Sequence, residues 1–218
     1  MKNIIKHRLF IAFLLFLAAF IIRSIKAGFF EPWGDEMDAA GTNINMFEEA
    51  TRWYRFHPMA PFQVTFNVVW KTLLHGNWYW QRFPLIVASS LSVVLFYFAL
   101  RRYLEKSWWA FLISLIPLTS FLMLYYAHDL RSYSYFWLLV LLTLAFGFRI
   151  FVEEKPTGAT LFLVILGFGL LPLVHYISWA HFLALGGAMS LSILLFSSQK
   201  WMNLLKGAAL YAFIIAAY

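Results

Sequence analysis

The sequence contains no cysteine and few charged residues for its length. Of its 218 residues, 12% are charged and 62% are hydrophobic, whereas a soluble domain is about half apolar and about a quarter charged. The absence of cysteine excludes disulfides, thiolate metal sites and cysteine nucleophiles. A surface with so little charge does not suit water, and we therefore expect a protein embedded in a lipid bilayer.

The chain also lacks a basic cluster and a basic amphipathic helix, although its net charge is +7. Its lysines and arginines stand at the ends of apolar runs, where a membrane topology places them. We therefore predict no nucleic-acid partner. Aromatic residues make up 21% of the chain, a content typical of the aromatic belts at the two faces of a bilayer.

Apolar runs long enough to cross a bilayer follow one another along the chain, since a spanning helix needs about 20 mainly apolar residues. We interpret the first run, 9–25, as an uncleaved helix because Arg23 and Lys26 flank it without a small-residue cleavage site. The later runs are 83–100, 108–126, 133–152, 159–176, 178–197 and 207–218. The sequence thus predicts an all-α integral membrane protein, a polytopic bundle of about seven transmembrane helices that forms one domain over 1–218.

A long polar stretch, 27–82, separates the first two runs. Within it, four polar residues recur at every fourth position and so share one helical face: Gln63, Asn67, Lys71 and His75. This pattern predicts an amphipathic helix over 61–75 that lies in the interface and does not cross the membrane.

The distribution of lysine and arginine predicts the orientation. With 61–75 on the outer surface, ten lysines and arginines and three acidic residues face inward, while seven of each face outward. The positive-inside rule therefore predicts a cytoplasmic N-terminus and an external loop over 27–82.

This topology gathers titratable residues from separate segments on the external side, and such residues in a membrane protein are functional candidates. The long loop carries Asp35, Glu36 and His57. The other segments add His128, Asp129, Arg131, Tyr133, His175 and Tyr176.

These residues stand in short motifs that resemble those of the type C membrane glycosyltransferases, which include the protein O-mannosyltransferases and the bacterial aminoarabinose transferases. The segment 33–36, Trp-Gly-Asp-Glu, resembles the family's Asp-Glu motif after the first helix. The segment 57–61, His-Pro-Met-Ala-Pro, resembles its His-Pro-Pro, and 82–84, Arg-Phe-Pro, its Arg-Leu-Pro. The segment 126–133 is similar to its Tyr-x-x-acid-x-Arg-x-Tyr turn, and 175–176 matches a later His-Tyr.

The resemblance implies an enzyme that moves a hexosyl or pentosyl group from a polyprenyl phosphate to a protein, lipid or glycan acceptor on the external face of the cell membrane. It implies Asp35 as the base that deprotonates the acceptor hydroxyl, with Glu36 assisting it or binding a metal. Arg131 would pair with the donor phosphate. The remaining substrate-binding candidates are His57, Asp129, Tyr133, His175 and Tyr176. Family members have more helices, so we expect this chain, whose last run stops at Tyr218, to be the N-terminal portion of a longer protein.

Each candidate also has a structural interpretation. Asp35 and Glu36 would then be a solvated loop pair, and Asp129 with Arg131 a surface salt bridge worth less than about 1 kcal/mol. Carboxylates and histidines also bind divalent metals, so a metal site stays open. The alternative functions are a transporter or flippase for a lipid-linked or anionic substrate, or an inactive fragment. Transporters show charges or broken helices near mid-membrane, often in symmetric halves, and no repeat is visible in this sequence.

Overall fold

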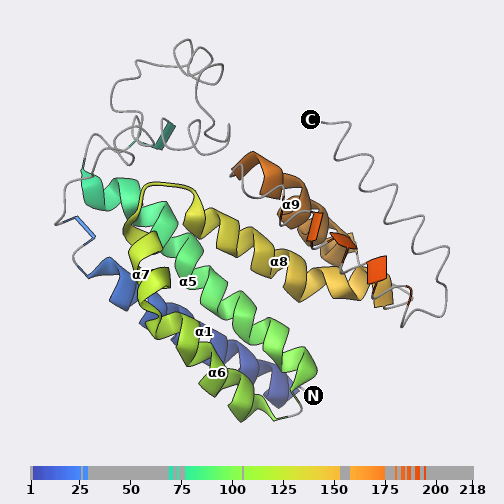
Figure 1. The fold of residues 1–218 in the computed structure, drawn as a ribbon. Coiled ribbons are helices and arrows are strands. Elements are labelled where there is room, and N and C mark those ends of the chain that lie inside the picture. Colours follow the sequence, from blue (N-terminus) through green and yellow to red (C-terminus); the bar gives the residue numbers. More distant parts are fainter. Residues whose placement is uncertain are drawn as a thin grey trace.

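The computed structural model describes residues 2–25, 27–28, 77–104, 106–152 and 158–174, together with a few positions within 69–73 and 180–194 (Figure 1). These residues form helices and no strand, which confirms the all-α prediction for this part of the chain. The helices are α1 (Lys2–Ser24), α5 (Trp78–Tyr103), α6 (Ser107–Thr119), α7 (Phe121–His128), α8 (Tyr133–Val152) and α9 (Gly158–Val174).

Among the described residues, two helices are long and apolar enough to cross a membrane. They are α1 over Lys6–Ser24 and α5 over Trp78–Arg101. The pair α6 and α7 adds a third candidate span if the two bent helices count as one. The described residues therefore support two to three spans. The predicted runs 178–197 and 207–218 lie largely or wholly outside the described residues.

The predicted run 108–126 forms two helices in the structure, which meet at 53°. Pro117 lies near the end of α6, and Ser120 between the helices adopts an extended ψ of 122°. Proline has no N–H to continue the hydrogen-bond ladder, and its ring clashes with the carbonyl four residues earlier. For Pro117 that carbonyl belongs to residue 113, inside α6. The break at Ser120 therefore lies three residues beyond the proline, on the side where the ring does not interrupt the ladder.

Helix α5 is the central element of the bundle. It contacts α1, α6 and α7 on one side and α8 on the other, while α9 packs on α8 (Figure 1). One apolar cluster joins α1, α5 and α6; its buried members include Leu15, Ala19, Val93, Tyr97 and Ala110. A second joins α5, α8 and α9 and includes Leu85, Leu130, Phe136, Phe168 and Leu171.

The close contact between α8 and α9 requires a glycine. A Cβ atom on Gly167 would lie 2.9 Å from Thr143 Oγ1 and 3.1 Å from Leu142 Cδ2. Gly169 is two residues later, on about the opposite side of α9. A Cβ on Gly169 would meet nothing within 4 Å. The two helices therefore lie close together at Gly167, where a larger side chain would clash.

One end of the bundle gathers the segment that follows α1, the start of α5, the end of α7, the start of α8 and the end of α9. The contacts that define this end include His128 with Arg23 and Arg82 with Ala27. Val174 belongs to the same apolar cluster as Leu130. We call this the Arg131 end of the bundle. It includes the turn between α7 and α8.

Near its C-terminal end, the long loop contacts the first turn of α5 through Trp70. Pro84 has no N–H, so the carbonyl of Trp80, four residues earlier, lacks its helical donor. The indole Nε1 of Trp70 donates to that carbonyl at 2.7 Å. Residues 69, 70 and 73 are helical, in agreement with a helix over 61–75; whether it lies in the interface stays a prediction.

Candidate functional site

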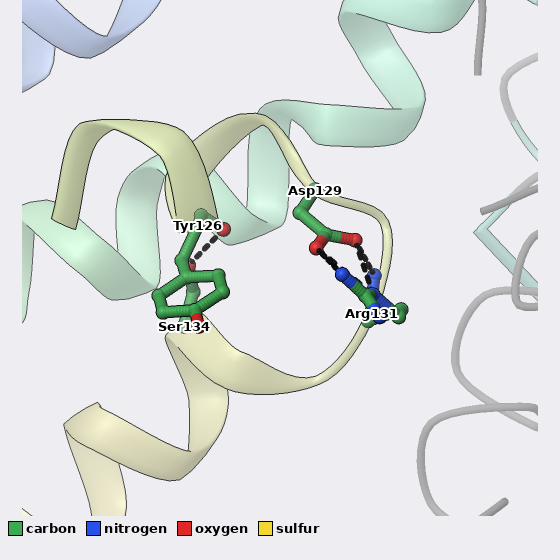
Figure 2. A network of polar contacts seen from close by, with 4 residues as sticks. All are labelled: Tyr126, Asp129, Arg131 and Ser134. Carbon is green, nitrogen blue, oxygen red and sulfur yellow. Dashed lines mark hydrogen bonds and ion pairs between the residues drawn. The ribbon is translucent and has the colours of Figure 1, made fainter. Parts of the chain in front are cut away.

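The turn between α7 and α8 is closed by Asp129 and Arg131 (Figure 2). The Arg131 Nε donates to both carboxylate oxygens of Asp129, at 3.0 and 2.9 Å, and Nη2 donates to Oδ2 at 2.7 Å. The backbone N–H of Arg131 also donates to Oδ1, at 3.0 Å. The Asp129 side chain is 2% exposed and that of Arg131 21%. The acid is thus buried and fully engaged, whereas the arginine reaches the surface.

The pairing fixes the charge state of the arginine. Hydrogen bonding from the guanidinium to Asp129 raises the pKa of Arg131 above its usual value, so the side chain stays cationic at any pH that the protein meets. The Nε–Nη2 edge of the guanidinium is occupied by the carboxylate. An anion bound at this turn would therefore meet an arginine that Asp129 already orients.

Aromatic rings extend the turn on one side. The Arg131 guanidinium lies 5.0 Å from the centre of the Tyr133 ring, a cation–π distance. The Tyr133 and Tyr126 rings are 4.4 Å apart, and Ser134 Oγ donates to the Tyr126 carbonyl at 2.8 Å (Figure 2). These contacts hold the end of α7 against the start of α8, so the turn between them has one defined shape.

Arg23, in the last turn of α1, is fully buried at the same end. Its Nε donates to Ser89 Oγ of α5 at 2.8 Å, and its Nη2 donates to the carbonyl of Pro117 at 3.0 Å. Nη1 lies 3.4 Å from the carbonyls of Ala19 and Leu118. One side chain therefore connects α1, α5 and the end of α6 through neutral acceptors.

The sequence interpretation treated Arg23 as a charge flanking the first helix and missed this role. A signal was present, because the apolar run 9–25 continues past the arginine. An arginine inside such a run must find partners within the protein. The partners themselves could not be identified from the sequence.

His128 forms a second link to the same arginine. Its ring Nε2 is hydrogen bonded to the backbone carbonyl of Arg23. A carbonyl only accepts hydrogen bonds, so Nε2 is the donor and carries the proton. The last residue of α7 is therefore tied to the last turn of α1, directly before Asp129.

Arg82 attaches the beginning of the long loop to α5. It is buried, and its Nη1 donates to the carbonyl of Ala27 at 2.7 Å. The next residue, Gly28, lies so close to α5 that a Cβ would be 3.0 Å from Tyr79 Cβ. The segment that leads to Asp35 therefore starts from a fixed position at the Arg131 end.

The structure brings together Asp129, Arg131 and Tyr133 among the predicted site residues. The other predicted residues lie outside the described part of the chain, and their roles stay predictions: Asp35, Glu36, His57, His175 and Tyr176. Among the described residues, no group of three His, Asp or Glu side chains is arranged to hold a metal ion. The metal site that the sequence leaves open involves Glu36, which lies outside the described residues.

Comparisons of the chain with models of protein families, with curated proteins and with solved structures find no match. The likeness to the type C membrane glycosyltransferases therefore depends on the motifs of this sequence.

Proposed function

We propose that this chain belongs to a membrane glycosyltransferase that moves a sugar from a polyprenyl phosphate to an acceptor hydroxyl at the external face of the membrane. The observation that carries the proposal is the Asp129–Arg131 turn. The motif of 126–133 suggested a shared function for this acid and this arginine, and the two side chains form a bidentate pair at the end of the bundle where the long loop begins.

The proposed orientation puts the Arg131 end outside. The N-terminal part of α1 and the turn between α5 and α6 lie at the opposite end, where Lys6, Arg8 and Lys106 are exposed. An excess of lysine and arginine is typical of the cytoplasmic side. This distribution supports a cytoplasmic N-terminus.

The chemistry needs three things: a groove for a lipid tail, a cation for the phosphate and a base for the acceptor. Apolar side chains on the outside of the helices, such as Phe13, Ile116 and Phe121, suit contact with lipid. In the reaction, the acceptor oxygen attacks the anomeric carbon while the bond from that carbon to the phosphate oxygen breaks. The phosphate leaves with the electron pair, and a cation next to it stabilises the developing charge. We assign this role to Arg131.

The acceptor proton must go to a base, and we assign this role to Asp35. Glu36 assists Asp35 or binds a divalent metal, and His57, His175, Tyr176 and Tyr133 contact the donor. The structure fixes the start of the loop at Gly28, seven residues before the acid. The assignment of the base itself depends on the motif of 33–36.

Sugar transfer by the purified full-length protein, with a panel of polyprenyl-phosphate sugars as donors, tests the proposal. Asp35→Asn keeps the shape of the side chain and removes the base, so turnover should fall about 10²–10⁴-fold. Asp38→Asn, in the same loop and outside the motif, is the matched control and should retain turnover. Equal activity of the two variants would refute the assignment of the base. No transfer from any donor by the wild-type protein would refute the enzyme.

One observation favours the alternative function, a transporter or flippase. Transporter sites are typically built from broken transmembrane helices, and the α6–α7 pair is broken, with the buried Arg23 beside the break. Proteoliposomes loaded with a fluorescent lipid-linked sugar distinguish the functions. Movement of the intact lipid between leaflets, without transfer of the sugar, would support the transporter.

A further inference from the structure

The break between α6 and α7 is contacted on both sides by one residue. The Arg23 guanidinium donates to the carbonyls of Pro117 and Leu118, in the last turn of α6. The Arg23 backbone carbonyl accepts a hydrogen bond from His128, the last residue of α7. Ser89 strengthens the arrangement, because its Oγ accepts from Arg23 Nε and lies 3.4 Å from the carbonyl of Met123 in α7.

These contacts satisfy groups that the break leaves without helical partners. In a continuous helix the carbonyls of residues 117 and 118 would accept from the N–H groups four residues later. At the break they accept from the guanidinium instead. The end of α6 also carries the negative end of the helix dipole, which favours a cation at this position. A buried guanidinium with neutral partners is therefore stabilised where two helices separate.

We propose that Arg23 is a positioning residue that fixes the bend between α6 and α7 and thereby places the Asp129–Arg131 turn. Helix α7 has eight residues, and the turn follows it directly. Any change in the direction of α7 therefore displaces Asp129. An effect of Arg23 on turnover depends on the proposed function. The effect of Arg23 on the direction of α7 does not.

A lysine cannot replace this arginine. The planar guanidinium presents donors in several fixed directions, whereas an ammonium is a compact point charge on a flexible stem. Arg23 uses Nε towards α5, Nη2 towards α6, and Nη1 towards both α1 and α6. Arg23→Lys keeps the charge and removes the simultaneous contact with three helices.

The chain contains no cysteine, so cysteines introduced at two chosen positions are the only sites that a spin label modifies. The direction of α7 can therefore be measured from the distance between two labels. Spin labels replace Phe10 on α1 and Leu122 on α7, both of which are exposed. Phe10 lies about 20 Å along α1 from Arg23, which contacts the break. Double electron–electron resonance then reports the distance distribution between the two helices. A second pair, Phe10 and Leu91, joins α1 to α5 and serves as the matched control.

In the wild-type protein we expect a narrow distribution for both pairs. Arg23→Lys should broaden or shift the 10–122 distribution and leave the 10–91 distribution unchanged. His128→Ala should do the same, whereas His128→Gln, whose amide N–H can donate to the same carbonyl, should restore the narrow distribution. If Arg23→Lys does not fold, the comparison of His128→Ala with His128→Gln decides the question.

A 10–122 distribution that stays narrow in every variant that folds would overturn the proposal and leave Arg23 as a helix cap alone. A turnover assay on the same variants separates the two claims. Displacement of α7 with loss of sugar transfer supports both. Displacement in a protein whose wild-type form transfers no sugar supports the positioning role and refutes the proposed function.

Discussion

The two sides of α5 are held in different ways. On the α1 side, a buried arginine connects three helices through neutral acceptors that are up to 95 residues away in the sequence. On the α8 side, the packing is apolar, and the charged pair at its end joins residues two positions apart. The first arrangement fixes how helices lie relative to one another. The second fixes the shape of one turn and leaves the helix packing to side-chain volume.

Removal of the Arg23 guanidinium should give the largest loss of stability. Arg23→Met keeps much of the volume but leaves Ser89 and the carbonyls at the end of α6 without their donor, at a cost of about 3 kcal/mol. Thermal unfolding in detergent measures the effect. Arg8→Met, at an exposed position on the same helix, should cost less than about 0.5 kcal/mol. Equal losses would mean that the α1 side does not depend on its arginine.

Overpacking should be the main vulnerability of the α8 side. Gly167→Ala places a methyl group 2.9 Å from Thr143 Oγ1, which forces the helices apart at a cost of about 2 kcal/mol. Gly169→Ala should be neutral or stabilising, because its methyl group meets nothing within 4 Å and alanine is the better helix former. If Gly169→Ala proved less stable than Gly167→Ala in the same unfolding assay, α8 and α9 would pack differently from this structure.

The charged pair of the turn should contribute less than the arginine of the α1 side. Asp129→Asn removes the charge and weakens the bidentate contact with Arg131, and we expect a loss of about 1 to 2 kcal/mol. A double-mutant cycle with Arg131→Gln measures the coupling. Because Arg131 is partly exposed, the coupling should decrease with added salt. A coupling of zero would reduce the pair to an ordinary surface ion pair.

The smallest effect should come from a single hydroxyl. Ser89→Ala removes one acceptor from Arg23, and we expect a loss of about 1 kcal/mol. Ser92→Ala is the matched control, because Ser92 Oγ donates only to the carbonyl of Ala88 in its own helix. Thermal unfolding of the two variants compares the contribution of a hydrogen bond between helices, Arg23–Ser89, with that of a hydrogen bond within one helix, Ser92–Ala88. Equal stabilities would show that the Arg23–Ser89 bond adds nothing.

Local features could be predicted from the sequence, and distant contacts could not. The runs of apolar residues gave α1, α5, α8 and α9, because length and hydrophobicity determine which segments suit a bilayer. The Asp129–Arg131 pair followed from a separation of two residues. The break at Ser120 was not predicted, because the hydropathy of the run 108–126 does not register a bend.

Arg23 illustrates the limit most clearly. Its partners, Ser89, Pro117 and Leu118, come from other helices, and the relevant atoms of the last two are backbone carbonyls that carry no sequence signal. The buried Arg82 was noticed only as part of a motif. Its contact with the carbonyl of Ala27 is likewise a property of the fold.

The proposed function assigns to Arg131 the stabilisation of the departing phosphate of a lipid-linked sugar. The most direct test is the rate of sugar transfer by Arg131→Lys, which keeps the charge and removes the fork that Asp129 orients. We expect turnover to fall by about 10²-fold or more, while the free energy of unfolding changes no more than in Asp129→Asn. Turnover within about twofold of the wild-type protein would contradict this role of Arg131. The Asp129–Arg131 pair would then only stabilise the turn between α7 and α8.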